Sequence, residues 1–151
     1  IGDAQVAICL MVVGGEQITV MMAPVGYRYE YRVRYVDCDM QKVVYNAHYL
    51  TFVDDAMDCW LRSEFGDFES VGLDFMLKTA TVTWHGSARR GDTVAIECSA
   101  TRWGNTSFDV SFKGLVGSNH IFDSLVTYVS VDPVDHNKTP VPDALKSFLS
   151  Q

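Results

Sequence analysis

The clearest pattern in the chain is an alternation of polar and apolar side chains along residues 27–35. Tyrosines and one valine take the odd positions, whereas arginines and one glutamate take the even positions. A period of two is typical of a β-strand with one face against a core and the other in water. We therefore predict a half-buried strand over residues 27–35, with Tyr35 on its buried face.

The period changes to that of an α-helix after Asn46. Apolar residues then recur at the spacing of one helical face, at Leu50, Val53, Met57, Trp60 and Leu61. Asn46 is the predicted N-cap, because its side chain can accept a hydrogen bond from an amide of the first turn. Gly66 is expected to end the helix, because glycine readily adopts the left-handed conformation found there.

Four more strand-like runs follow the helix, at residues 75–85, 93–103, 106–116 and 120–131. Short turns rich in glycine, serine and asparagine separate the last three runs, which predicts hairpins and antiparallel neighbours. The tail carries three prolines and is expected to be a loop that ends in about one helical turn. One long helix among these strands predicts an α+β fold in which an antiparallel sheet curls around the helix.

Residues 1–26 precede this pattern and are predicted to be an extension of a domain formed by residues 27–151. Two apolar runs flank a Gly-Gly pair in the extension, which favours a β-hairpin. A secretory signal peptide is disfavoured, because no basic residue precedes the first apolar run. The remaining alternative is that the natural chain starts at Met21 or Met22 and that the earlier residues were added.

The composition narrows the class of protein. With 151 residues, 48 % of them hydrophobic and 21 % charged, the chain can form one domain with an adequate core. The net charge of −7 argues against nucleic-acid binding, since phosphate contacts need clustered cations. No apolar stretch reaches the roughly 20 residues of a membrane-spanning helix. The four cysteines lack metal-ligand spacing, and we expect free thiols in a cytoplasmic protein.

The candidate chemistry lies where the first strand leads into the helix. Asp37 and Asp39 form an Asp-x-Asp pair, followed by a short turn, a Val-Val step and then Tyr-Asn before the helix. Residues 32–50 resemble the hot-dog-fold acyl-CoA thioesterases, specifically the 4-hydroxybenzoyl-CoA thioesterase-like branch, and weaker matches extend over residues 27–149. The resemblance implies a five-stranded antiparallel sheet wrapped around one long helix. It also implies a homodimer or homotetramer with active sites at subunit interfaces.

By this resemblance, Asp39 is the catalytic carboxylate of an acyl-CoA thioesterase, acting as nucleophile or as general base for water. The backbone amide of Asn46 would hold the carbonyl oxygen at the helix N-terminus, where free N–H groups favour negative charge. Stabilisation of the charged carboxylate favours the nucleophile, whereas burial in an acyl pocket favours the base. A purely structural alternative is that Asp39 caps its turn.

The resemblance also implies residues that bind the substrate. Val44, Tyr45 and Tyr49 are expected to line the acyl pocket, although core packing explains Val44 equally well. Arg89 and Arg90 are candidates for binding the coenzyme A phosphates, with a simple surface role as an equal alternative. No cofactor or metal is implied, because coenzyme A is part of the substrate.

Two features leave alternatives open. Lys42 stands where the family usually has glycine, so a turn with positive φ would be strained there. The helix acids Asp54, Asp55 and Asp58 are a second set of candidate catalytic carboxylates, although a solvated acidic helix face explains them more simply. The alternative to an enzyme is a non-catalytic acyl-CoA-binding or regulatory protein of the same fold.

Overall fold

The computed structural model describes residues 8–13, 16–21, 26–68 and 72–151, with side chains described from residue 26 onward. Near the N-terminus, β1 (Ile8–Val13) pairs antiparallel with β2 (Glu16–Met21) in a two-stranded sheet. This pairing matches the expected hairpin. The glycine pair of its predicted turn lies outside the described residues.

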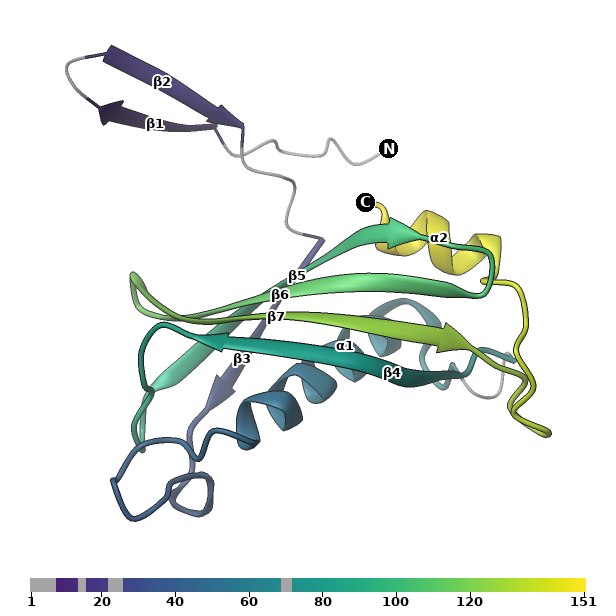
Figure 1. The fold of residues 1–151 in the computed structure, drawn as a ribbon, viewed down its shortest axis with the longest axis horizontal. Coiled ribbons are helices and arrows are strands. Elements are labelled where there is room, and N and C mark those ends of the chain that lie inside the picture. The colour runs from purple at the N-terminus through teal and green to yellow at the C-terminus, as the bar shows by residue number, and fades with distance from the viewer. Residues whose placement is uncertain (1–7, 14–15, 22–25, 69–71) are drawn as a thin grey trace.

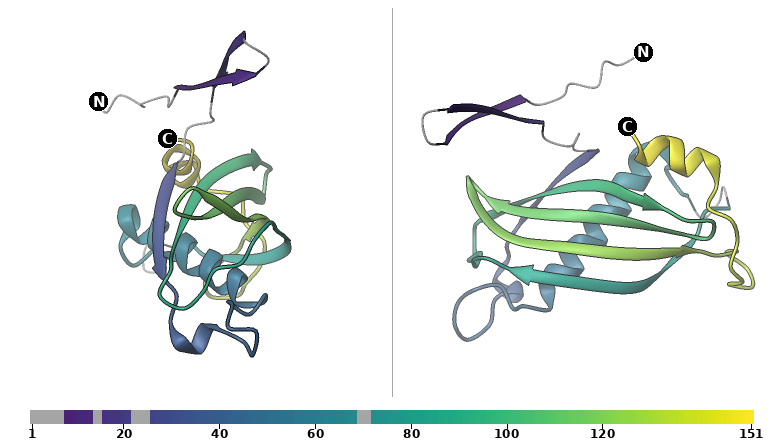
Figure 2. Two further views of the ribbon diagram at one scale, coloured as in Figure 1. Left: turned by 90° about the vertical axis from the view of Figure 1, so that its left-hand side faces the viewer. Right: turned by 45° about the horizontal axis from the view of Figure 1, so that its top comes forward.

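The main sheet is antiparallel and contains five strands in the order β3-β5-β6-β7-β4. These strands are β3 (Tyr27–Arg32), β4 (Phe75–Trp84), β5 (Thr93–Trp103), β6 (Ser107–Val116) and β7 (Asn119–Ser130). The sheet curves around the long helix α1 (His48–Phe65), and the short helix α2 (Asp143–Leu149) lies beside β5 (Figure 1, Figure 2). The predicted α+β hot-dog fold is confirmed.

The apolar stripe of α1 forms the core with the concave face of the sheet. The buried residues of the helix are Tyr49, Phe52, Val53, Ala56, Met57, Trp60 and Leu61. The tyrosine face of β3 packs against this stripe, with Tyr31 stacked on Phe52 at 4.1 Å between ring centroids. Burial therefore alternates along β3 as the period of two predicts. Within the described residues, no helix is long and apolar enough to cross a bilayer.

The prediction that the first strand continues to Tyr35 is wrong. β3 ends at Arg32, and the chain then turns into a short 3-10 helix, η1 (Tyr35–Asp37), which leaves Tyr35 78 % exposed. The cause is a capping interaction, in which the Asp37 carboxylate accepts a hydrogen bond of 2.7 Å from the Arg34 backbone N–H. This side-chain bond holds the backbone in a turn and ends the strand alternation.

The helix boundaries differ from prediction at one end. α1 begins at His48, and the N-cap position is Ala47 rather than Asn46. The Asn46 side-chain oxygen instead accepts a hydrogen bond of 2.9 Å from the neighbouring Ala47 N–H, so no side chain caps the helix. At the other end Gly66 has a φ of 61° and donates its N–H to the Arg62 carbonyl, which confirms the predicted stop.

Candidate active site

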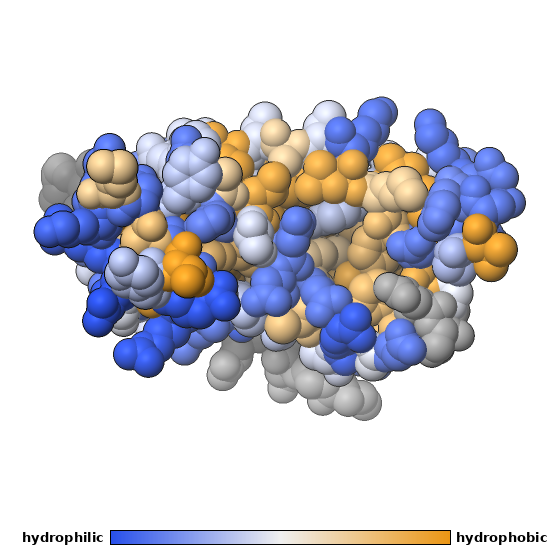
Figure 3. Space-filling model, turned by 90° about the horizontal axis from the view of Figure 1, so that it is seen from below, coloured by the Kyte–Doolittle hydropathy of each residue, from blue (hydrophilic) through white to orange (hydrophobic). Residues whose placement is uncertain are grey.

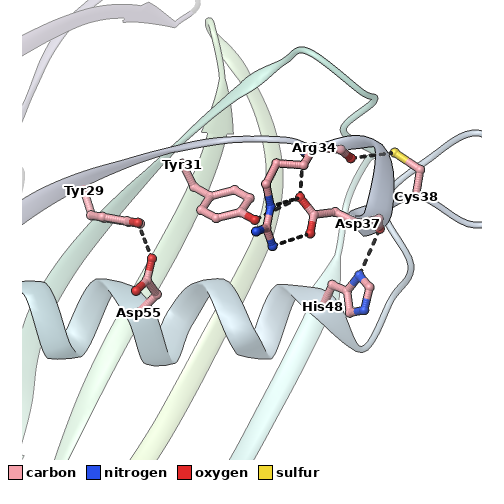
Figure 4. A network of polar contacts seen from close by, with 7 residues as sticks. All are labelled: Tyr29, Tyr31, Arg34, Asp37, Cys38, His48 and Asp55. Carbon is pink, nitrogen blue, oxygen red and sulfur yellow. Dashed lines mark hydrogen bonds and ion pairs between the residues drawn. The ribbon is translucent and has the colours of Figure 1, made fainter.

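Asp37 organises the segment between β3 and α1 (Figure 4). Its buried carboxylate accepts hydrogen bonds from the Tyr31 hydroxyl at 2.9 Å, from the Arg34 N–H at 2.7 Å and from the Arg34 guanidinium at 3.0 Å. Burial alone raises the pKa of Asp37, but the hydrogen bonds from Arg34 and Tyr31 outweigh it and hold this pKa below its ordinary value. Asp37 is therefore a charged structural anchor.

The backbone carbonyl of Asp37 ties this anchor to the start of α1. It accepts hydrogen bonds from the Tyr45 N–H at 2.9 Å and from Nδ1 of His48 at 3.0 Å. Because a carbonyl can only accept, the proton of this second bond lies on Nδ1 of His48. These two bonds fix the direction in which the chain enters the helix.

Asp39 begins the tight turn between these two points. Its N–H donates to the Val43 carbonyl at 2.9 Å, and its carbonyl accepts the Lys42 N–H at 3.0 Å. The Asp39 carboxylate accepts the Gln41 N–H at 2.9 Å, which is the turn-capping role weighed as the structural alternative. Lys42 has a φ of 63°, so the turn does require the positive φ that the family's usual glycine would supply.

Asp39 also faces open space. It borders a hollow of about 530 Å³ together with Tyr35, Val36, Cys38, Lys42 and Arg90. A neighbouring hollow of about 640 Å³ shares Tyr35 and Arg90 and adds Arg32 and Arg34. The turn therefore places a carboxylate at the edge of a cavity whose rim is cationic, although the whole chain is acidic.

The Asn46 amide is the second element of the predicted chemistry. Asn46 is exposed just before α1, and in the described part of the chain its backbone N–H has no hydrogen-bond acceptor. An unpaired amide at the start of a helix is a donor available to a carbonyl oxygen. The structure thus leaves this amide free for the role expected of it.

The remaining predicted binding residues separate into two groups. Arg90 borders the Asp39 hollow, whereas Arg89 is exposed and its N–H donates to the Asp92 carboxylate at 2.7 Å. Tyr45 is 48 % exposed beside the helix entrance. Val44 and Tyr49 are buried in the core.

The burial of Tyr49 has a specific structural reason. Its hydroxyl accepts the Ala88 N–H at 3.1 Å and so joins α1 to the loop that carries Arg90. The structure also reveals cations that sequence reasoning did not assign to the site, namely Arg32 and Arg34 at the end of β3. Both arginines are visible in the sequence at even positions of the predicted strand. Their convergence with Arg90 on one hollow depends on the turn that follows β3.

The helix acids have three different environments. Asp55 accepts a hydrogen bond from the Tyr29 hydroxyl, and Asp58 pairs with Arg62 at 2.8 Å. Asp54 instead borders an apolar hollow of about 200 Å³, where loss of solvent raises its pKa. The other residues around this hollow are Met57, Asp58, Leu61, Phe68, Phe75, Leu77 and Tyr128. Figure 3 shows apolar surface gathered in the middle of the underside of the molecule, between hydrophilic margins.

Comparisons with known proteins agree with this architecture. A family model described as the thioesterase-like superfamily matches residues 33–149. The acyl-CoA thioester hydrolase YbgC of Escherichia coli O6:H1 is 26 % identical over 129 residues, which cover 83 % of this chain and 96 % of that protein.

Two solved structures show the likeness of fold. A hypothetical protein of Aquifex aeolicus superposes with a TM-score of 0.76 at 16 % identity, covering 82 % of this chain and 99 % of that one. A 1,4-dihydroxy-2-naphthoyl-CoA thioesterase of Synechocystis superposes with a TM-score of 0.72 at 20 % identity, covering 82 % of this chain and 94 % of that one.

Proposed function

Because the chain belongs to the thioesterase-like superfamily, we propose that it hydrolyses an acyl-CoA thioester to a free acid and coenzyme A. Membership of the family confirms the resemblance seen in residues 32–50 and the class of enzyme, a thioester hydrolase. The observation that carries the proposal for this chain is the hollow bordered by Asp39, on the same connection between β3 and α1 as the free amide of Asn46. A carboxylate and a hydrogen-bond donor are the two groups that thioester hydrolysis requires here.

Asp39 can act in either of two ways. As a nucleophile, its carboxylate attacks the thioester carbonyl carbon, the C–S bond breaks, and coenzyme A leaves as a thiolate that takes a proton from water. A second water then hydrolyses the mixed anhydride and restores the carboxylate. As a general base, Asp39 takes a proton from the attacking water and returns it to the leaving thiolate. In both routes the Asn46 N–H stabilises the negative oxygen that forms on the carbonyl.

The cationic rim supports coenzyme A as the leaving group. Lys42 and Arg90 border the Asp39 hollow, and Arg32 borders the neighbouring one. Local cations of this kind can bind phosphates even on a chain with a net charge of −7. We therefore propose that Arg90 and its neighbours hold the phosphates. The half-exposed Tyr45 would contact the acyl group, whereas Val44 and Tyr49 pack in the core behind it.

We further propose a cytoplasmic homodimer or homotetramer. The three cysteines with described side chains, Cys38, Cys59 and Cys98, are free thiols, which suits a reducing compartment. β4 is an edge strand of the described sheet, so a second copy can pair with its outer side. Light scattering coupled to size-exclusion chromatography measures the mass of the assembly directly.

The decisive experiment is hydrolysis of a panel of acyl-CoA thioesters, followed with a reagent for the released thiol. Asp39→Asn should abolish turnover while the variant remains folded and binds the substrate. Asp143→Asn is the matched control, because this exposed carboxylate of α2 borders neither the Asp39 hollow nor the Asp54 hollow, and it should retain full activity. Turnover by Asp39→Asn together with its loss in Asp54→Asn would move the catalytic role to the helix.

The same experiment separates the two functional classes. A protein that binds acyl-CoA in calorimetry but hydrolyses no member of the panel would be a binding or regulatory protein. If water enriched in heavy oxygen transfers its label to Asp39 during single turnover, the carboxylate is the nucleophile. Transfer of the label to the product acid alone is expected of the general base, and equally of a mixed anhydride that water cleaves at its acyl carbonyl.

A further inference from the structure

A compact group of metal-binding side chains lies away from the Asp39 hollow. His85 follows the last residue of β4, while His120 and Asp123 lie on the adjacent strand β7. Nε2 of each histidine lies 2.8 Å from an oxygen of the Asp123 carboxylate, and the two oxygens serve one ring each. None of the three residues borders the Asp39 hollow.

The geometry of this group suits one metal ion. One ligand atom from each residue can be chosen so that all three lie within 4.8 Å of one another. A zinc ion with bonds of about 2.0–2.2 Å to nitrogen and oxygen needs its ligand atoms about 3–4 Å apart. Both rings already direct Nε2 to the same carboxylate, with their centroids 4.4 Å apart, so small side-chain rotations bring the three atoms onto one ion.

The backbone that carries these ligands is held firmly. The N–H groups of His85 and Gly86 both donate to the Ile121 carbonyl, at 2.7 Å and 3.0 Å. The backbone of His85 is thus hydrogen-bonded to β7 at a point between His120 and Asp123. All three side chains are partly exposed, which leaves a fourth coordination position open to water.

We propose that His85, His120 and Asp123 bind a divalent transition-metal ion such as Zn²⁺, in a structural site separate from the candidate active site. Two imidazoles and one carboxylate are borderline ligands that suit zinc and its neighbours rather than calcium or magnesium. A bound ion replaces the two hydrogen bonds by three metal–ligand bonds and joins the end of β4 to β7.

The site also lies at the root of the loop that carries Arg90. Three residues after His85, Ala88 donates its N–H to the Tyr49 hydroxyl and accepts the Val44 N–H at 2.9 Å. A metal ion at the start of this loop would therefore stabilise a segment that also contacts the core and the candidate active site. The ion acts on stability and does not touch the reacting atoms.

Titration of the metal-free, full-length protein with Zn²⁺ against a chromophoric chelator tests the proposal. We expect saturation at one ion per chain and a rise in Tm when zinc is added. His120→Ala and His85→Ala should each weaken zinc binding by at least about tenfold. Even the loss of a residue that only hydrogen-bonds to a metal ligand typically costs that much affinity. His136→Ala is the matched control, since this exposed histidine near Asp74 lies elsewhere and should leave zinc affinity unchanged.

Nuclear magnetic resonance gives an independent measurement on the unmutated protein. The chain contains four histidines, and zinc should shift the imidazole signals of His85 and His120 but not those of His48 and His136. Absence of saturable zinc binding, equal affinity in the His120→Ala variant, or zinc shifts confined to other histidines would each overturn the proposal.

Discussion

Replacing Asp37 by alanine removes the carboxylate that holds together the segment between β3 and α1. The substitution deletes the acceptor of three hydrogen-bonding groups, namely the Tyr31 hydroxyl, the Arg34 N–H and the Arg34 guanidinium. It introduces no steric conflict, because alanine is smaller than aspartate. The loss of stability therefore measures the contribution of this anchor to the fold.

The magnitude follows from the exposure of each donor. The Arg34 side chain is 66 % exposed and can return to water, so its ion pair adds little to the total. The Tyr31 hydroxyl and the Arg34 N–H each lose a hydrogen bond to a charged acceptor, which is worth about 1.5–3 kcal/mol. Since neighbouring losses are not additive, we expect a total near 3 kcal/mol, which lowers Tm by about 6–12 °C in a chain of this length.

Urea and thermal unfolding of the wild type and of Asp37→Ala give this difference. Asp58→Ala is the matched control, because it breaks an exposed ion pair between adjacent turns of α1, with Arg62, and should cost only about 0.2–0.5 kcal/mol. If Asp37→Ala loses no more stability than this control, the anchoring role of Asp37 is refuted.

The difference in stability between the wild type and Asp37→Ala should depend on pH. The folded pKa of Asp37 is held below its ordinary value, chiefly because the hydrogen bonds from Arg34 outweigh the effect of burial. The contribution of Asp37 to stability is therefore complete above the unfolded pKa of about 3.9 and disappears as pH falls through the lower folded value. The stability gap between wild type and variant should shrink on acidification, and a gap that widens would contradict this linkage.

Three further predictions concern other parts of the chain. Arg90→Ala should raise KM for an acyl-CoA about tenfold but not for the matching acyl-N-acetylcysteamine thioester, which lacks the phosphates. An equal rise in KM for both substrates would show that Arg90 does not bind the phosphates. Tyr128→Phe should raise stability in urea by about 1 kcal/mol, because its buried hydroxyl has no partner within the described residues, and a loss would reveal one. Gly114→Ala should cost about 1–3 kcal/mol or more, because the new Cβ would lie 2.0 Å from the Phe122 ring; wild-type stability would contradict this packing.

The elements of the fold could be predicted because their signals are local. The alternation along β3 and the apolar stripe of α1 each repeat within a few residues, so the sequence shows them directly. Tyr35 was misplaced because the hydrogen bond that the Asp37 carboxylate accepts from the Arg34 N–H overrides the alternation. The N-cap was displaced by one residue because the Asn46 side chain bonds the adjacent amide instead.

The site was only partly predictable, because its members converge through pairing of distant segments. Val33 exchanges backbone hydrogen bonds with Gly91 and Asp92, which brings Arg90 to the end of β3. Residue spacing along the chain does not contain that information. The same applies to His85 and His120, which meet only because β4 and β7 are neighbours in one particular register.

Most hydrogen bonds that shape the Asp39 turn are local. They join residues no more than 11 positions apart, from the bonds of Arg34 to Asp37 up to the contact between Asp37 and His48, whereas the Val44 N–H donates to the distant Ala88 carbonyl. Closing such short loops costs little chain entropy, so this turn can form without waiting for the distant strands to pair. The sequence of this candidate site can therefore change while the sheet and helix that carry it stay as they are.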